Sequence, residues 1–203
     1  SRGIAIREHD GRKGHLRQCA AAELRYAALG THWANTVRRV LVIGSGGSGK
    51  STLSTHLGRV LGLPVIHLDQ LYWKPGWVEP DKTEWAETVR NVIRRDTWVL
   101  DGNYSGTLQE RLEACDTVVF LDVSRLVCVW RVMARTIKHR GKTRPDMPEG
   151  CPERFGIPFP MWIWSYPARS RPNVLSLLST HRSSKNVIHL RTRKDVESFL
   201  AAL

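Results

Sequence analysis

Residues 44–51 constrain the fold of this chain more than any other segment. Their sequence, GSGGSGKS, fits the pattern GxxxxGK[ST]. An apolar run at 37–43 precedes the motif and an amphipathic stretch at 53–61 follows it, which is the strand-to-helix context that a phosphate-binding loop requires. Glycines let the backbone approach phosphate oxygens closely, and the amides at the start of the helix then face the anion. The motif therefore predicts a phosphate-binding loop rather than a chance glycine-rich turn.

We predict that this loop binds the phosphates of ATP. Lys50 is placed to reach the β- and γ-phosphates, so we expect it to be catalytic, and the Ser51 hydroxyl is a predicted ligand of Mg²⁺. The sequence contains no guanine-recognition motif of the form NKxD, which argues against a GTPase. The predicted ATP-binding residues are Gly44, Ser45, Gly46, Gly47, Ser48, Gly49, Lys50, Ser51 and Thr52.

Short apolar runs recur beyond the loop, at 64–68, 97–101, 116–123 and 186–190. Helical patterns lie between or after them, at 81–95, 107–114, 125–139, 161–179 and 195–203, and we expect the one at 161–179 to be disturbed near Pro167 and Pro172. Strands that alternate with helices predict an α/β P-loop fold, with a parallel sheet and helices on both of its faces. Residues 70–80 and 140–160 carry prolines and glycines, so we expect them to be irregular.

The composition bounds the class of protein. The chain has 203 residues, of which 41% are hydrophobic, enough for one domain with a sizeable core. Lys and Arg total 31 against 19 Asp and Glu, which suggests an anionic partner: a nucleotide, a nucleic acid or an acidic surface. No apolar run approaches the roughly 18 residues of a membrane-spanning helix, and we expect no membrane partner. The four cysteines form no CxxC pair, so we expect reduced thiols in a cytoplasmic protein and no zinc site.

Residues 1–36 differ from the rest of the chain. They mix Arg, Gly and His without a clean period, and the stretch 19–29 is rich in alanine. We expect them to form an N-terminal extension, poorly defined or helical, outside a main domain at 37–203.

Three aspartates follow apolar runs: Asp69, Asp101 and Asp122. In a parallel sheet the carboxyl ends of the strands lie beside the phosphate loop, so such side chains point towards a ligand there. We predict that Asp101 holds Mg²⁺ or its water, and that Gly102 lets the backbone approach the ligand. Asp69 is placed where an acceptor hydroxyl meets the γ-phosphate, and is the predicted catalytic base. Asp122 leads straight into a helix and is expected to be structural.

Arginines are concentrated before and within the segment 140–160. Arg131 and Arg135 are four residues apart on one helical face, where two guanidinium groups suit stabilisation of a transferring phosphoryl group. We expect both to be catalytic. Arg140, Arg144 and, on a later helix, Arg169 are predicted to contact the substrates. The alternative for any one of these arginines is a solvated basic face.

The chain has eight tryptophans. Trp73 and Trp77 lie in the irregular segment directly after Asp69, and we predict that they form a wall for the acceptor. Three others fall in predicted helices or strands and are expected in the core. These are Trp85, Trp98 and Trp130.

From about residue 37 to the C-terminus, the chain resembles the adenylate-kinase-like P-loop kinases, and within them the DNA topology modulation (FlaR-like) family. The resemblance is carried by GSGGSGKST (44–52), LDQLYWKPGW (68–77), LDGNYS (100–105), and TRPDMPEGCPERF (143–155) with WIW at 162–164. It implies a five-stranded parallel sheet, an acceptor-binding part at 70–95 and a short mobile lid at 140–158. It also implies that Asp101, Arg131, Arg135 and Asp69 correspond to functional positions of such kinases.

The chain differs from true adenylate kinases in its short lid and in the tryptophans at 70–80, which leaves the acceptor open. We expect an adenylate-kinase-like phosphotransferase that moves the γ-phosphoryl group of ATP to a small acceptor, a hydroxyl being slightly favoured over a nucleoside monophosphate. One alternative is a nucleic-acid-associated regulatory ATPase that affects DNA topology, which the net charge of +12 supports. Another is a nucleotide-binding switch without efficient chemistry.

Overall fold

The computed structural model describes residues 33, 36–144, 146–153 and 156–203. The chain divides into two compact units, one of them Val37–Arg191 and the other including Thr192–Leu203. In the second unit, α10 (Arg193–Ala201) is capped by Thr192, and Phe199 packs edge-on against Trp33 with ring centroids 6.0 Å apart. The expected N-terminal extension lies outside the described residues apart from 33 and 36, so it stays a prediction. No helix in the described part of the chain is long and apolar enough to cross a bilayer.

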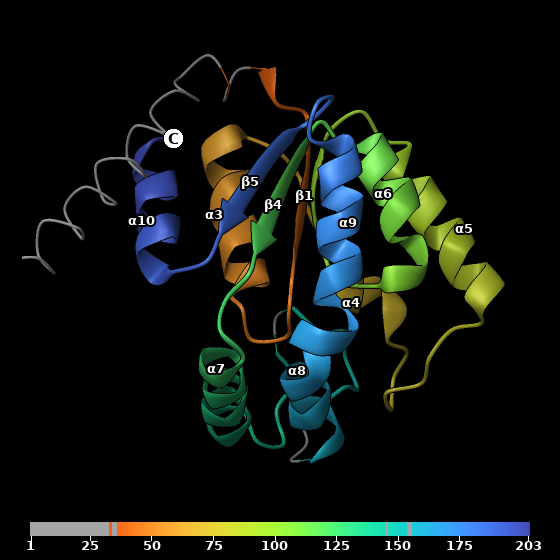
Figure 1. Cartoon of the computed structure of the whole chain (residues 1–203). Coiled ribbons are helices and arrows are strands. Elements are labelled where there is room, and N and C mark those ends of the chain that lie inside the picture. The colour runs from red at the N-terminus through yellow and green to blue at the C-terminus, as the bar shows by residue number, and fades with distance from the viewer. Residues whose placement is uncertain (1–32, 34–35, 145, 154–155) are drawn as a thin grey trace, which may run out of the picture. The chain divides into compact units, whose positions relative to one another are not determined.

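The unit Val37–Arg191 is built on a sheet of five strands (Figure 1). The strands are β1 (Arg39–Gly44), β2 (Val65–His67), β3 (Trp98–Asp101), β4 (Thr117–Leu121) and β5 (Asn186–Leu190). Their order across the sheet is β2-β3-β1-β4-β5, and each neighbouring pair is parallel. The predicted α/β P-loop fold with a five-stranded parallel sheet is confirmed, and the glycine-rich loop follows the central strand.

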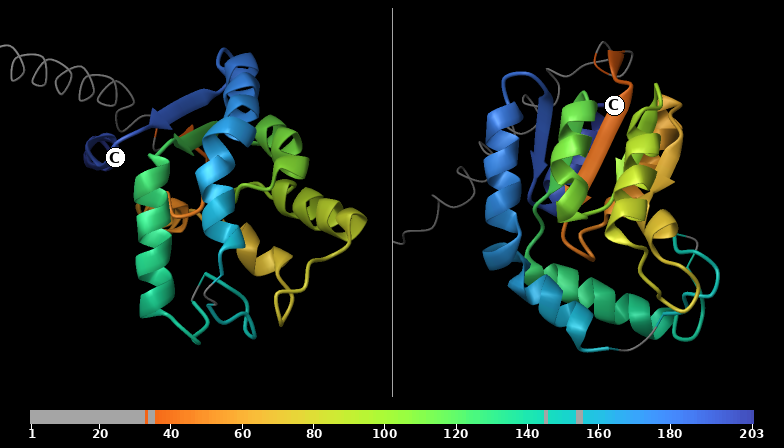
Figure 2. Two further views of the ribbon diagram at one scale, coloured as in Figure 1. Left: turned by 60° about the horizontal axis from the view of Figure 1, so that its bottom comes forward. Right: turned by 90° about the vertical axis from the view of Figure 1, so that its right-hand side faces the viewer.

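Helices cover both faces of this sheet, as predicted (Figures 1 and 2). On one face α3 (Lys50–Leu61) lies against β1, β2 and β3 and buries Leu53 and Leu57. On the other face, α5 (Lys82–Ile93), α6 (Leu108–Ala114) and α9 (Arg171–His181) share one hydrophobic core with the sheet. Both faces of the strands are therefore apolar, and all four residues at 40–43 of β1 are fully buried.

Two further helices lie side by side beyond the carboxyl ends of the strands (Figure 2). These are α7 (Arg125–Lys138) and α8 (Pro158–Arg169). The helical stretch expected at 161–179, with a disturbance near its prolines, consists of two helices, α8 and α9, which meet at Ser170. Pro172 follows this junction and has no amide hydrogen with which to continue the helical hydrogen bonds of α8. The segment 70–80 is also less irregular than expected, because α4 (Leu68–Tyr72) covers its start.

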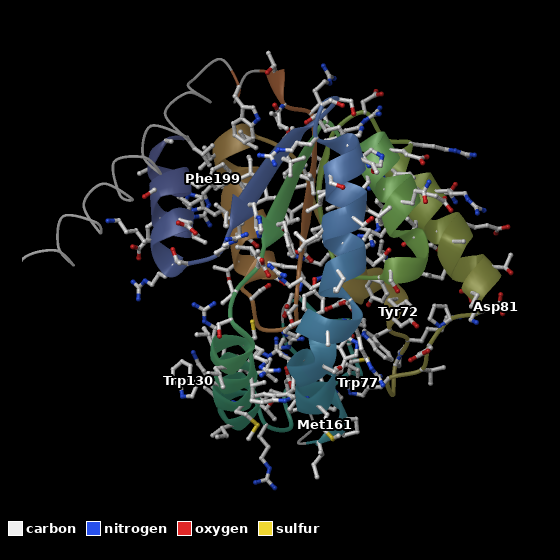
Figure 3. The ribbon with its side chains drawn as sticks, in the orientation of Figure 1. Tyr72, Trp77, Asp81, Trp130, Met161 and Phe199 are labelled. Atoms are coloured by element: carbon white, nitrogen blue, oxygen red, sulfur yellow. The ribbon has the colours of Figure 1, made fainter. Side chains whose placement is uncertain are left out.

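The tryptophans divide by burial. Trp85 and Trp98 are buried as predicted, but the prediction that Trp130 lies in the core is wrong, since Trp130 is 69% exposed. Helix α7 packs inward through Cys128 and Val132, and Trp130 is two residues from each, on the opposite side of the helix. Figure 3 shows its side chain on the side of α7 that faces away from α8.

Candidate active site

A cavity of about 490 Å³ lies at the carboxyl edge of the sheet. Its walls come from the phosphate loop and α3, the ends of β2 and β3, helix α7 and the segment 139–146. The predicted site residues that line it are Gly46, Gly47, Gly49, Lys50, Ser51, Thr52, Asp69, Asp101, Arg131, Arg135 and Arg144. One cavity thus brings together the residues predicted for metal binding and catalysis and most of those predicted for phosphate binding; Gly44, Ser45 and Ser48 are not in its lining.

The phosphate loop is shaped to receive an anion. Gly47 has a φ of 75°, and a Cβ there would lie 2.4 Å from the Cys128 carbonyl oxygen, so only glycine lets α7 come this close. The Ser45 and Ser48 hydroxyls are buried without a hydrogen-bond partner among the described residues. Buried unsatisfied hydroxyls in a loop that leads into a helix N-terminus fit the oxygens of a bound phosphate.

Two cations contact this loop. Lys50 Nζ donates to the Ser45 carbonyl oxygen over 2.9 Å, and Arg131 Nη1 donates to the Ser48 carbonyl oxygen over 3.2 Å. Burial lowers the pKa of Lys50, while the carboxylates of Asp69 and Asp101 act in the opposite direction. Both side chains are therefore held at the loop, where phosphate oxygens can replace the carbonyl groups as acceptors.

Asp101 ends β3 and is paired with His67, the last residue of β2, in the register of the two strands. Asp101 Oδ2 lies 2.7 Å from His67 Nδ1. This hydrogen bond raises the pKa of His67, although burial opposes the shift. His67 also lines the cavity, and sequence analysis misses it because the pairing depends on the register of strands far apart in the chain.

The residues around Asp101 fit a magnesium ion. Ser51 and Asp101 line the same cavity, and a hydroxyl and a carboxylate are oxygen ligands that Mg²⁺ accepts. Among the described residues, no group of three or more His, Cys, Asp and Glu side chains is arranged to hold a metal ion.

Gly102 leaves space for a neighbouring side chain. A Cβ at Gly102 would lie 2.8 Å from Leu68 Cβ, and its φ is 145°. The missing side chain therefore makes room for Leu68 at the start of α4, and the approach of this backbone to a ligand stays a prediction.

Asp69 lies in the first turn of α4, two residues beyond the end of β2. The Tyr104 hydroxyl donates to Asp69 Oδ1 over 2.7 Å. The loop that carries Tyr104 is shaped by Arg111, whose buried guanidinium donates to the carbonyl oxygens of Gly102 and Tyr104. Burial lowers the pKa of Arg111 to about 10, so it stays charged at neutral pH. Neither Tyr104 nor Arg111 is identified from the sequence, because no local sequence pattern indicates the hydrogen bonds that they form.

Glu153, in the segment 140–158 that is predicted to be a lid, is paired with two of the predicted arginines. Its Oε1 lies 3.1 Å from Arg135 Nε and 2.7 Å from Arg144 Nε. Arg144 Nη1 also pairs with Asp146 Oδ2 over 3.0 Å. The Glu153 carboxylate is buried, with 8% of the residue exposed, and sequence analysis does not identify it. The ion pair between Glu153 and Arg135 thereby links the predicted lid segment to α7.

Four predicted substrate-binding residues are not among those that line the cavity: Trp73, Trp77, Arg140 and Arg169. The Trp73 and Trp77 rings lie 5.3 Å apart, and Trp77 Nε1 donates to the Pro152 carbonyl oxygen over 3.0 Å. Trp77 therefore links the segment 70–80 to Pro152 of the predicted lid segment. Figure 3 shows Trp77 on the same flank as Tyr72. Arg140 and Arg169 are exposed. Contact of these four residues with a substrate stays a prediction.

Asp122 is structural, as predicted. It accepts two hydrogen bonds of 2.7 Å from Arg171 and one of 2.8 Å from His189 Nε2. These bonds fix the start of α9 to the ends of β4 and β5.

Comparison with known proteins adds the following. No protein-family model matches the chain, and no curated protein sequence matches it. Solved structures with a similar fold include a shikimate kinase from Acinetobacter baumannii in complex with shikimate, with a TM-score of 0.49 and 16% identity over 82% of this chain and 90% of that one. A gluconokinase from Sinorhizobium meliloti has a TM-score of 0.44 and 17% identity over 81% and 90%. A shikimate kinase from Bacteroides thetaiotaomicron has a TM-score of 0.44 and 18% identity over 82% and 96%.

Proposed function

We propose that this protein is a kinase that transfers the γ-phosphoryl group of ATP to a hydroxyl group of a small acceptor. The observation that carries the proposal is the position of Asp69. Its carboxylate lines the same cavity as Lys50 of the phosphate loop and is held there by the Tyr104 hydroxyl. A base and a phosphate-binding cation that face one cavity are the groups that phosphoryl transfer to a hydroxyl requires.

On the donor side, the loop amides and Lys50 bind the ATP phosphates, and Arg131 and Arg135 approach from α7. Their positive charges balance the charge that spreads over the transferred group. Ser51 and Asp101 would hold Mg²⁺, which when bound neutralises phosphate charge. ATP·Mg²⁺ is thus the donor, and Lys50, Arg131 and Arg135 are the catalytic cations.

On the acceptor side, Asp69 accepts the proton of the hydroxyl as its oxygen forms a bond to the γ-phosphorus. The bond from that phosphorus to the bridging oxygen of ADP breaks, and the products are a phosphate monoester, ADP and one proton. One Asp69 oxygen is occupied by the Tyr104 hydroxyl, and the other is left to take the proton.

This cavity is less suited to an acceptor that is phosphorylated on an existing phosphate group. Its oxygens are already ionised near neutral pH, so it needs cations rather than a base. The acceptor-side segment 70–95 is described in full and contributes no arginine or lysine to the cavity. Arg90 of that segment is instead paired with Glu110, 3.0 Å away on α6.

The proposal is tested by ADP formation from ATP and Mg²⁺ with a panel of sugars, alditols, nucleosides and nucleotides. We expect a hydroxyl compound to raise ADP formation, and Asp69→Asn to abolish that rise while the acceptor still binds. Asp96→Asn, at an exposed position outside the cavity, is the matched control. A rise with DNA alone would instead indicate a regulatory ATPase, and no rise with any compound would indicate a switch.

A further inference from the structure

Phe159 is the one large apolar side chain in the cavity lining, as far as the described part of the chain goes. The rest of the lining consists of glycines, hydroxyl groups, histidines and charged side chains. Phe159 lies in the first turn of α8 and is 44% exposed. Water covers an aromatic ring less favourably than an apolar ligand surface does. The ring therefore offers a single apolar contact inside an otherwise polar cavity.

The ring of Phe159 lies against the phosphate loop. A Cβ at Gly46 would lie 2.7 Å from Phe159 Cζ, so the missing side chain at Gly46 makes room for the ring. Lys50 Nζ donates to the carbonyl oxygen of Ser45, the residue before Gly46, over 2.9 Å. Because the lysine of such a loop reaches the β- and γ-phosphates, Phe159 lies at the γ-phosphate end of the loop.

A side chain at this end contacts the acceptor rather than the nucleoside of ATP. The three phosphates of ATP lie in a row, so the nucleoside is separated from the γ-phosphate by the two others. In-line transfer requires the acceptor hydroxyl to approach the γ-phosphorus from the side opposite to the ADP oxygen. Asp69, the proposed base, lines the same cavity as Phe159. The aromatic ring and the base are thus both available to one acceptor.

Other aromatic residues of α8 hold Phe159 in place. Its ring is stacked with that of Trp162, with centroids 5.9 Å apart and an angle of 6° between the planes. The ring of Trp162 lies 5.8 Å from that of Tyr166, which is buried one turn further along the helix. A ring that is already held in one orientation loses little conformational entropy when a ligand packs against it. Phe159 is therefore a preformed part of the cavity wall.

From this arrangement we propose that Phe159 is a specificity-determining residue that packs against the acceptor, and that the acceptor is a cyclic polyhydroxy compound such as a sugar or a cyclitol. A ring of this kind carries C–H groups on one face, which suit the negative face of an aromatic ring. Its hydroxyl groups lie around the edge, where they suit the polar remainder of the lining. An open-chain polyol has no fixed apolar face. This inference rests on the proposed function and narrows its substrate class.

Pairs of acceptors that differ in ring closure test the inference. Each pair consists of a hexose, which is a ring in solution, and its open-chain alditol, which carries the same hydroxyl groups. We expect kcat/KM to be about tenfold or more higher for the ring, because the open chain must be ordered and has no flat face for Phe159. An alditol, a nucleoside or a nucleotide used as well as the best sugar or cyclitol overturns the inference and leaves the proposed kinase intact. ADP formation that no compound raises overturns both.

The variant Phe159→Leu separates contact with the acceptor from a merely structural role. Leucine keeps an apolar side chain against Gly46 but has no flat face. We expect KM for the ring acceptor to rise about tenfold while kcat and KM for ATP stay nearly unchanged, so that the preference for the ring over the open chain falls. A rise in KM for ATP alone would assign Phe159 to the donor. An equal loss with every acceptor would make its role structural, and either result overturns the assignment.

Trp164→Leu is the matched control. Trp164 is an aromatic residue of the same helix with a similar exposure of 48%, but it is not in the cavity lining, and the Arg125 guanidinium lies 4.1 Å from its ring centroid. We expect this variant to leave both KM values and the preference for the ring unchanged. A change as large as that in Phe159→Leu would show that the effect comes from the packing of α8, and it would overturn the proposed contact with the acceptor.

Discussion

The Tyr104 hydroxyl and the Asp69 carboxylate are joined by a hydrogen bond of 2.7 Å, which links the loop after β3 to the first turn of α4. Burial and the neighbouring Asp69 raise the pKa of Tyr104 far above its usual value. The phenol therefore stays protonated at any pH used for an enzyme assay and remains a donor to Asp69. Its ring packs 4.5 Å from that of Tyr72 and 4.8 Å from that of Trp85, which fixes the direction of the hydroxyl.

Loss of this hydroxyl tests whether Asp69 must be oriented. Tyr104→Phe keeps the ring packing and removes the donor, so we expect kcat to fall about tenfold with a small change in KM for ATP. Steady-state kinetics measures both values. Tyr72→Phe removes a hydroxyl from the neighbouring ring and is the matched control. Equal kcat values for Tyr104→Phe and the wild type would show that Asp69 needs no such support.

Removal of the loop cation should separate activity from stability. Lys50→Ala is expected to lower turnover about 10²- to 10³-fold, because a charge aimed at the phosphates is lost. Burial lowers the pKa of Lys50, which means that its charged form destabilises the folded protein. The thermal midpoint of the variant should therefore equal or exceed that of the wild type. Lys82→Ala, at an exposed position, is the control. Turnover within a few-fold of wild type would remove Lys50 from its assigned role.

Glu153 should hold the lid segment closed. Glu153→Gln leaves Arg135 and Arg144 without their shared charge, and breaking a buried ion pair costs about 3 kcal/mol. We expect faster tryptic cleavage at the exposed Arg140 and Lys142, and faster ATP hydrolysis without acceptor, because water enters an open site. A non-hydrolysable ATP analogue should slow cleavage of the wild type. Glu149→Gln is the control and should leave the rates of tryptic cleavage and of ATP hydrolysis unchanged. Unchanged rates in Glu153→Gln would show that Glu153 does not hold the segment closed.

Asp122 should stabilise the fold in a pH-dependent way. Burial favours its protonated form, but the hydrogen bonds from His189 and Arg171 outweigh burial and lower the pKa of Asp122 below the ordinary value of 3.8. A depressed pKa contributes stability that is present above pH 3.8 and is lost as the pH falls through the folded-state value. Asp122→Asn should therefore lower the free energy of unfolding, measured with urea at neutral pH, by about 2 kcal/mol. Below pH 3.8 the free energies of unfolding of the variant and the wild type should become more similar. A difference that does not change with pH would contradict this.

Local patterns in the sequence predict most of the fold. The phosphate loop is recognisable from the glycines of residues 44–49, and each strand from a short apolar run, so a few consecutive residues suffice to predict them. Asp81 is likewise recognisable as the cap of α5, and its carboxylate accepts a hydrogen bond of 2.7 Å from the Thr83 amide. The same pattern predicts Ser124 as the cap of α7, but its side chain forms no capping hydrogen bond. No local pattern predicts the strand order β2-β3-β1-β4-β5, because it depends on pairing between strands far apart in the chain.

The missed parts of the site depend on distant segments. His67 meets Asp101 because β2 and β3 pair in one register, although the residues are 34 positions apart. Trp77 reaches Pro152 across 75 positions, and its own φ of 67° is rare for a residue other than glycine. Glu153 is one of many charged residues in the lid segment, and only the folded chain shows that it is buried between two arginines.

The chemical nature of the product tests the central claim most directly. The wild-type protein, ATP, Mg²⁺ and the best acceptor of the panel are incubated together, and the product is examined by ³¹P NMR. Transfer to a hydroxyl with Asp69 as base predicts a new phosphate monoester resonance, formed in equal amount with ADP and missing in Asp69→Asn. A new phosphoanhydride resonance, or a monoester formed at an undiminished rate by Asp69→Asn, would contradict it.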